Sequence, residues 1–221
     1  GFPEAWMDSA VAVSKIAVSL DPTAAEGYKA LGNALQSKGE LRNALLLYYK
    51  AVELNPNYAP VFPNISSVNL KLGRLDETIK WIRKAILLQP GFARWYAPLG
   101  WYYLLLGCDS LAVHWSQKAL ELQPDSFFPH VVLGYTYLFT GRFDEARASA
   151  TTALTVGPDE YFSVDEAGDI EMFTGNFRQA KEFFERGVKQ AGTASESGIK
   201  LAYVLQKLGE KKHSERILDT M

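Results

Sequence analysis

The sequence has little of the chemistry that marks secreted, membrane or nucleic-acid-binding proteins. Its one cysteine, Cys108, excludes an intramolecular disulfide framework and suits a reducing compartment. The net charge of −2 argues against a general nucleic-acid binder. The most apolar run, Trp95 to Leu106, contains Pro98 and Gly100 and falls short of the ~20 residues that span a bilayer. We therefore expect no membrane insertion and no nucleic-acid partner, and we favour a cytoplasmic location.

Catalytic and cofactor motifs are also missing from the sequence. No glycine-rich phosphate loop, HExxH, CxxC or GxSxG occurs. His114, His130 and His213 are far apart, without the spacing of metal ligands. The sequence identifies no base partner for Cys108. It therefore predicts no enzyme activity, no metal site and no cofactor.

Prolines, in contrast, recur at a fixed interval. Five of them lie 34 residues apart: Pro22, Pro56, Pro90, Pro124 and Pro158. Proline lacks a backbone donor and disfavours helix at the residue before it, so each one predicts the end of a helix. The chain is thus divided into units of constant length, which indicates a repeat architecture.

Each unit reads as two short helices with a turn between them. In the unit that begins at Ala25, one apolar stripe at helical spacing precedes the turn at Lys38-Gly39 and a second stripe follows it. The first stripe is Tyr28, Leu31, Gly32 and Leu35, and the second is Ala44, Tyr48 and Ala51. A glycine marks the turn in five units: Gly39, Gly73, Gly107, Gly141 and Gly175.

This pattern resembles the tetratricopeptide repeat family, over nearly the whole chain. The Leu-Gly pair of the first helix (helix A) appears as Leu31-Gly32, Leu99-Gly100 and Leu133-Gly134. The small residue early in the second helix (helix B) is Ala44, Ala112, Ala146 and Ala180. The resemblance implies an all-α fold, a right-handed α-solenoid superhelix of antiparallel helical hairpins. Small residues let helix A and helix B approach closely, and stacked units bury the face that one hairpin leaves open.

The repeat register predicts one solenoid of five full repeats with partial units at both ends. The full repeats span residues 25–58, 59–92, 93–126, 127–160 and 161–194. Residues 195–221 form a partial repeat with a polar capping helix. Residues 1–24 hold a helix B without its helix A, so its upstream face should be exposed. The chain opens with Gly-Phe-Pro, and we expect it to be part of a longer protein.

Helix A lines the concave groove in the family that the chain resembles, so the resemblance implies a peptide-binding surface there. Along the predicted groove the residues change from polar and mildly basic, through aromatic, to acidic. The candidate peptide-binding residues are Lys29, Asn33, Asn64, Arg94, Trp101, Tyr135, Phe139, Asp165, Glu166, Asp169 and Tyr203. Two alternatives stay open: Leu104, Leu138 and Met172 as core residues, and Asp165 and Glu166 as a solvated acidic face.

A sharper hypothesis concerns four of these residues. Some chaperone-cofactor repeats hold a C-terminal carboxylate with a clamp of two asparagines and three basic residues. Lys29, Asn33, Asn64 and Arg94 match four of the five places, but the fifth is Pro98, whose side chain cannot bind an anion. The asparagines also belong to the packing background of the family.

The sequence therefore predicts a non-catalytic scaffold that binds an extended peptide or a partner helix in its groove. One alternative is a regulatory or sensory arm of a larger enzyme, such as a bacterial signalling enzyme. Another is a module that self-associates through its uncapped N-terminal helix. The upstream sequence and the dependence of light scattering on concentration would discriminate these alternatives.

Overall fold

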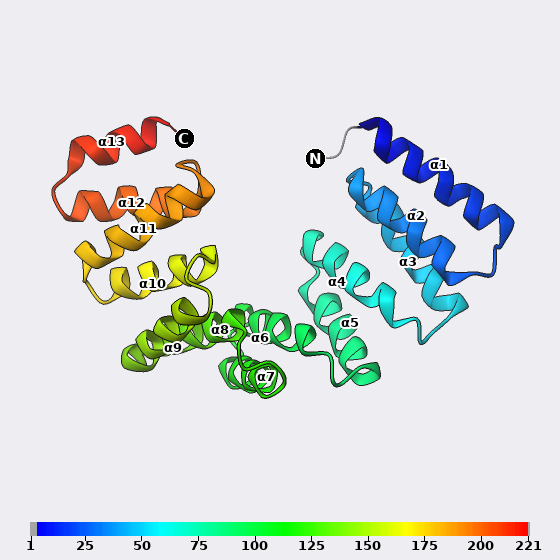
Figure 1. The fold of residues 1–221 in the computed structure, drawn as a ribbon, viewed down its shortest axis with the longest axis horizontal. Coiled ribbons are helices and arrows are strands. Elements are labelled where there is room, and N and C mark those ends of the chain that lie inside the picture. Colours follow the sequence, from blue (N-terminus) through cyan, green and yellow to red (C-terminus); the bar gives the residue numbers. More distant parts are fainter. Residues whose placement is uncertain (1–3, 221) are drawn as a thin grey trace. The chain divides into compact units, whose positions relative to one another are not determined.

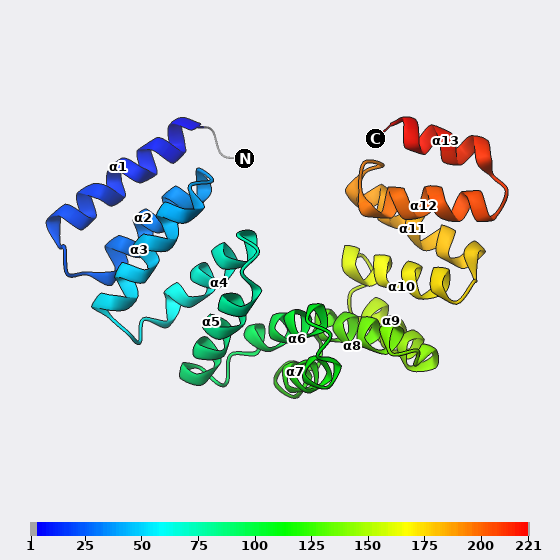
Figure 2. The same cartoon turned by 180° about the vertical axis from the view of Figure 1, so that it is seen from behind.

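The computed structural model describes residues 4–220, which fall into two compact units, residues 4–95 and 96–220. All regular elements of the described residues are helical, which confirms the all-α prediction (Figures 1 and 2). The division falls inside the third predicted repeat. Unit 1 contains α1 (Glu4–Leu20), α2 (Ala25–Ser37), α3 (Leu41–Leu54), η1 (Ala59–Val61), α4 (Phe62–Lys71), α5 (Leu75–Leu88) and η2 (Ala93–Trp95).

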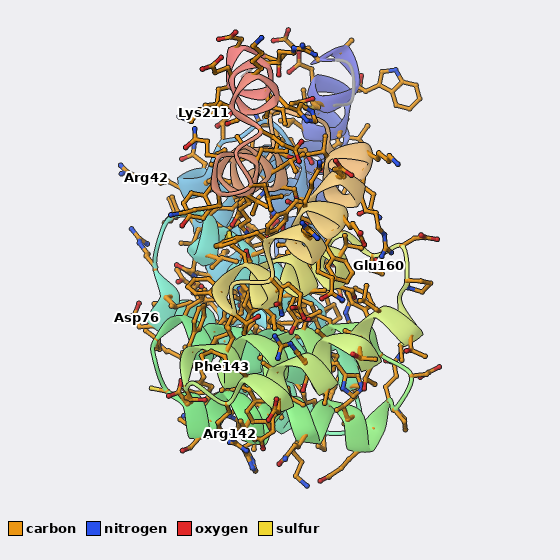
Figure 3. The ribbon with its side chains drawn as sticks, turned by 90° about the vertical axis from the view of Figure 1, so that its left-hand side faces the viewer. Arg42, Asp76, Arg142, Phe143, Glu160 and Lys211 are labelled. Carbon is orange, nitrogen blue, oxygen red and sulfur yellow. The ribbon has the colours of Figure 1, made fainter. Side chains whose placement is uncertain are left out.

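Unit 2 consists of four helical hairpins. Its helices are α6 (Tyr96–Leu105), α7 (Asp109–Leu122), α8 (Phe127–Phe139), α9 (Phe143–Val156), α10 (Tyr161–Phe173), α11 (Phe177–Ala191), α12 (Glu196–Lys207) and α13 (Lys211–Asp219). Each even-numbered helix packs against the next odd-numbered one, as helix A and helix B of a repeat. In Figure 3, Phe143 marks the start of α9 and Glu160 the residue before α10.

The periodic prolines end helices as expected. Asn55, Gln89 and Gln123 each precede a proline and adopt φ values of −139°, −136° and −143°, outside the helical range. Prolines near helix starts have a different effect. Ala59–Val61, with Pro60, is a 3₁₀ turn, so α4 begins only at Phe62. A similar delay precedes Pro98, because α6 begins at Tyr96 after the 3₁₀ turn Ala93–Trp95.

Small residues bring helix A against helix B within each hairpin. A Cβ atom built on Gly32 of α2 would lie 2.5 Å from the Tyr48 ring of α3. A Cβ atom built on Gly168 of α10 would likewise lie 2.5 Å from the Phe184 ring of α11. The second repeat has Ser66 at this place, and its hydroxyl donates a 2.9 Å hydrogen bond to the carbonyl of Thr78. The second repeat thus has a polar contact at the same helix crossing.

Buried clusters continue from one hairpin to the next in unit 2. Leu138 of α8 joins Ala146 and Ala150 of α9 and Ile170 of α10 in one cluster. Phe184 of α11 packs with α12 and with Ile217 of α13 in another. Each hairpin therefore buries its open side against its neighbour, as expected for stacked repeats.

Candidate functional site

The A helices of unit 2 carry a chain of neighbouring aromatic rings. The centroid of Trp101 lies 5.8 Å from that of Tyr135 and 6.0 Å from that of Phe128. Phe128 continues to Phe162 at 5.8 Å, and Tyr135 to Phe139 at 5.9 Å. The rings come from α6, α8 and α10, so packing of consecutive A helices assembles them. Edge-to-face and offset contacts at such distances stabilise aromatic pairs beyond their area burial.

The last residue of each of these helices is apolar and exposed. Leu105 ends α6, Phe139 ends α8 and Phe173 ends α10, at the 34-residue period of the repeat. Phe139 and Phe173 are 64% and 63% exposed. We call Leu105, Phe139 and Phe173 the apolar row. Large apolar side chains in a repeated row are a candidate interaction surface.

The residue before each member of the row behaves differently. Leu104 and Leu138 are buried, and Met172 is half-buried and packs against the cluster around Phe184. Their interpretation as core residues is therefore confirmed. Within each repeat, one position faces the core and the next faces solvent.

A buried ionic network lies beside the aromatic chain. Lys200 Nζ of α12 lies 2.6 Å from Asp165 Oδ2 and 2.7 Å from Asp169 Oδ2 of α10. Ser197 donates a 2.7 Å hydrogen bond to Asp165, and the Tyr135 hydroxyl donates one of 2.8 Å to Asp169. Both carboxylates are buried. The network therefore joins α8, α10 and α12 through contacts within the chain itself.

The pKa values in this network shift with burial and with neighbouring charge. Burial raises the pKa of the Tyr135 hydroxyl, and the carboxylate of Asp169 adds to the shift. Burial also raises the pKa of Asp169, although Lys200 opposes that effect. For Lys200, burial favours the neutral form but the carboxylates of Asp169 and Asp165 outweigh it, so its pKa is raised. The ammonium group is thus held in its charged form.

Glu166 lies next to this network but takes no part in it. Its side chain is fully buried, and neither carboxylate oxygen has a hydrogen-bond partner among the described residues. Burial, with the nearby Asp169, raises its pKa well above the usual range. Its carboxyl group lies against Gly134, in the space that a Cβ atom at that position would take.

One expectation for the acidic end of the surface is therefore wrong. Asp165 and Glu166 do not form a solvated acidic face, because α8 and α12 cover them. Asp165 and Asp169 both pair with Lys200. Lys200 lies close to one repeat length after each aspartate. That spacing of opposite charges is the signal in the sequence that could have indicated the ion pairs.

In unit 1 a hydrogen bond joins the two asparagines of the candidate clamp. The Tyr48 hydroxyl lies 2.8 Å from Asn33 Oδ1, and Asn64 Nδ2 donates a 3.0 Å hydrogen bond to the same oxygen. Burial raises the pKa of Tyr48 to about 12. The two asparagines thus join consecutive A helices. Lys29 is half-buried on α2, whereas Arg94 is exposed and lies 5.1 Å from the Trp95 ring.

The last candidate, Tyr203, is half-exposed on α12, and its ring lies 5.2 Å from Lys207 Nζ.

Cys108 is exposed as a free thiol. Within residues 4–220 no group of His, Cys, Asp or Glu side chains could hold a metal ion, and no helix is long and apolar enough to cross a membrane.

Paired helices, small residues at each helix crossing and a 34-residue period define an α-helical hairpin repeat protein. The family model described as tetratricopeptide repeat matches residues 25–58, 61–92 and 130–160. A comparison with curated proteins finds no match. The chain thus contains tetratricopeptide repeats.

Solved structures of the same fold agree with this assignment. A tetratricopeptide repeat protein from Parabacteroides merdae ATCC 43184 is 18% identical with a TM-score of 0.82, over 97% of this chain and 85% of that chain. TTC0263, a thermophilic TPR protein from Thermus thermophilus, is 21% identical with a TM-score of 0.69, over 83% of this chain and 100% of that chain. YrrB, a TPR protein with an unusual peptide-binding site, is 23% identical with a TM-score of 0.61, over 80% and 91%.

Proposed function

We propose that the chain is a non-catalytic protein-interaction scaffold, and that the A helices of unit 2 bind an extended peptide or a partner helix. The observation that supports this proposal is the apolar row, in which Leu105, Phe139 and Phe173 repeat at one position of consecutive A helices and remain exposed. Buried aromatic contacts supply most of the energy in many protein interfaces. YrrB, a protein of similar fold, is described as a TPR protein with an unusual peptide-binding site.

The chemistry of the surface favours an apolar ligand. Asp165 and Asp169 are already paired with Lys200, so they leave little free charge for a basic ligand side chain. Phe139 belongs to both the apolar row and the aromatic chain, since its ring stacks on that of Tyr135. A ligand with two or more large apolar side chains, spaced to meet Phe139 and Phe173, fits this surface best. Its affinity should change little with ionic strength.

A peptide-display selection on the immobilised chain tests the proposal. Each selected peptide is then titrated against the wild type, Phe139→Ala/Phe173→Ala and Leu111→Ala/Leu122→Ala. The last variant removes two exposed leucines of α7, a B helix of the same unit. We expect the phenylalanine variant to weaken binding about tenfold or more and the leucine variant to leave it unchanged.

Circular dichroism establishes that all three proteins are folded. Peptides that bind the phenylalanine variant as tightly as the wild type would refute the proposed surface. A strong loss of affinity at high salt would refute its apolar character.

A further inference from the structure

The α8–α9 hairpin lacks the ring that fills the helix crossing in two other repeats. In the fifth repeat the ring of Phe184 lies 2.5 Å from where a Cβ atom on Gly168 would stand, and Tyr48 fills the same place in the first repeat. One repeat length before Phe184, α9 has Ala150, opposite Gly134 of α8. The methyl group of Ala150 is too short to replace a ring, so a space remains over Gly134.

The carboxyl group of Glu166, which comes from the next A helix, fills that space. The three atoms nearest to a Cβ atom built on Gly134 are the carboxyl carbon and both carboxyl oxygens of Glu166. The Glu166 side chain is fully buried. We call this contact between Glu166 and Gly134 the α8–α10 junction. A carboxyl group thus stands where the first and fifth repeats have an aromatic ring.

The surroundings of the junction suit a neutral carboxyl group better than a carboxylate. Ala150 belongs to the apolar cluster of Leu138, Ala146 and Ile170. Neither oxygen of Glu166 has a hydrogen-bond partner among the described residues. An unpaired buried charge is strongly unfavourable, so the group must either hold a proton or move toward water.

Neighbouring charges do not compensate a carboxylate at Glu166. Asp169 carries the same charge and adds to the effect of burial in raising the pKa of Glu166. Burial lowers the pKa of His130, one helical turn before Gly134, and so favours its neutral form. The other titratable groups around the junction are engaged elsewhere: Lys200 with Asp165 and Asp169, Tyr135 with Asp169, and Arg147 with Glu171.

We propose that Glu166 is a pH-sensitive switch of the α8–α10 junction: protonated, its carboxyl group fills the space over Gly134, and ionised, it leaves that space and the junction opens. The junction is closed at low pH and opens as the pH rises, which is the direction that a raised carboxyl pKa requires. Because α8 ends at Phe139 and α10 at Phe173, opening changes the spacing of two members of the apolar row. That consequence for binding rests on the function proposed above, whereas the opening itself does not.

Hydrogen exchange followed by mass spectrometry, from about pH 5 to about pH 9, tests the switch. At each pH the exchange rate of the wild type is divided by that of Glu166→Gln, which keeps the shape of the side chain but cannot ionise. The division removes the intrinsic dependence of exchange on pH. Because opening releases one proton, the ratio in α8 and α10 should rise about tenfold per pH unit above the usual carboxyl pKa of 4.5, until the pH reaches the pKa of the closed state.

Two further variants test the geometry. Glu171→Gln is the matched control, since Glu171 is also a buried carboxyl group of α10 but accepts hydrogen bonds from Arg147 and Asn176. It should keep the pH dependence of the wild type over this range. Ala150→Phe/Glu166→Ala supplies the ring of the first and fifth repeats and should keep the junction closed at every pH. Circular dichroism checks that each variant is folded.

Three results would overturn the switch. The first is a flat ratio in α8 and α10. The second is an equal rise in α12 and α13, which would mean that the whole unit unfolds instead of one junction opening. The third is a rise in the folded Ala150→Phe/Glu166→Ala variant, which would assign the pH dependence to a different group. None of these results bears on the apolar row, because the peptide titrations test that surface separately.

Discussion

The hydroxyl of Tyr135 donates a 2.8 Å hydrogen bond to the carboxylate of Asp169, the residue 34 positions later. The two residues occupy the same place in consecutive repeats, so the bond joins neighbouring A helices directly. Asn33 and Asn64 make a comparable bond in unit 1 at 3.0 Å. Polar contacts thus supplement apolar packing between consecutive repeats in both units.

Removing this hydrogen bond should destabilise unit 2. Tyr135→Phe leaves the buried carboxylate of Asp169 without one donor, and we expect a loss of about 1–3 kcal/mol in the free energy of unfolding. Urea denaturation followed by circular dichroism measures the change. Tyr137→Phe is the control, because the Tyr137 hydroxyl has no hydrogen bond among the described residues. Equal effects of the two substitutions would contradict a specific role for the bond.

Lys200 should contribute more than an exposed cation does. Lys200→Met leaves two buried carboxylates without their counter-charge, at an expected cost of about 3–5 kcal/mol near neutral pH. Because unpaired buried carboxylates favour protonation, the loss should shrink as the pH falls. Denaturation at several pH values measures it. Asp169→Asn in the same chain should recover part of the loss, and no recovery would argue against coupling between the two residues.

The close approach of α2 and α3 can be tested at a single glycine. A Cβ at position 32 would lie 2.5 Å from the Tyr48 ring, so Gly32→Ala should destabilise the chain by roughly 1–3 kcal/mol. Gly91 has no atom within 4 Å of such a Cβ, and Gly91→Ala should change stability by less than about 0.5 kcal/mol. Thermal unfolding of both variants compares them. A larger cost at position 91 would contradict the packing argument.

Much of the fold could be predicted because the determinants are local and periodic. Pre-proline residues end helices, and glycine and alanine at fixed positions set the helix crossings. The site was less predictable, because its charges are satisfied across repeats. A sequence shows that Asp165, Asp169 and Lys200 exist but not that α12 places the ammonium group between the two carboxylates. A pocket between α1 and α2 could not be predicted either, because side chains from two helices line it.

Two glutamates of α10 should respond to pH in opposite directions. Burial raises the pKa of Glu166, whose carboxyl oxygens have no partner among the described residues. Burial also acts on Glu171, but hydrogen bonds from Arg147 and Asn176 outweigh it and lower its pKa. A raised carboxyl pKa contributes stability below the usual value of 4.5, and that contribution is lost as the pH rises through the folded-state pKa. A lowered pKa contributes stability above 4.5, which is lost as the pH falls.

Glu166→Gln and Glu171→Gln separate these two effects. Relative to the wild type, Glu166→Gln should gain stability as the pH rises from 4 toward 8, by about 1 kcal/mol or more, because the variant has no proton to bind on folding. Glu171→Gln should lose stability over the same range, because it loses a charged partner of Arg147. Urea midpoints measured across this pH range give both slopes. Parallel pH profiles for the two variants would show that burial of Glu166 does not suppress its ionisation.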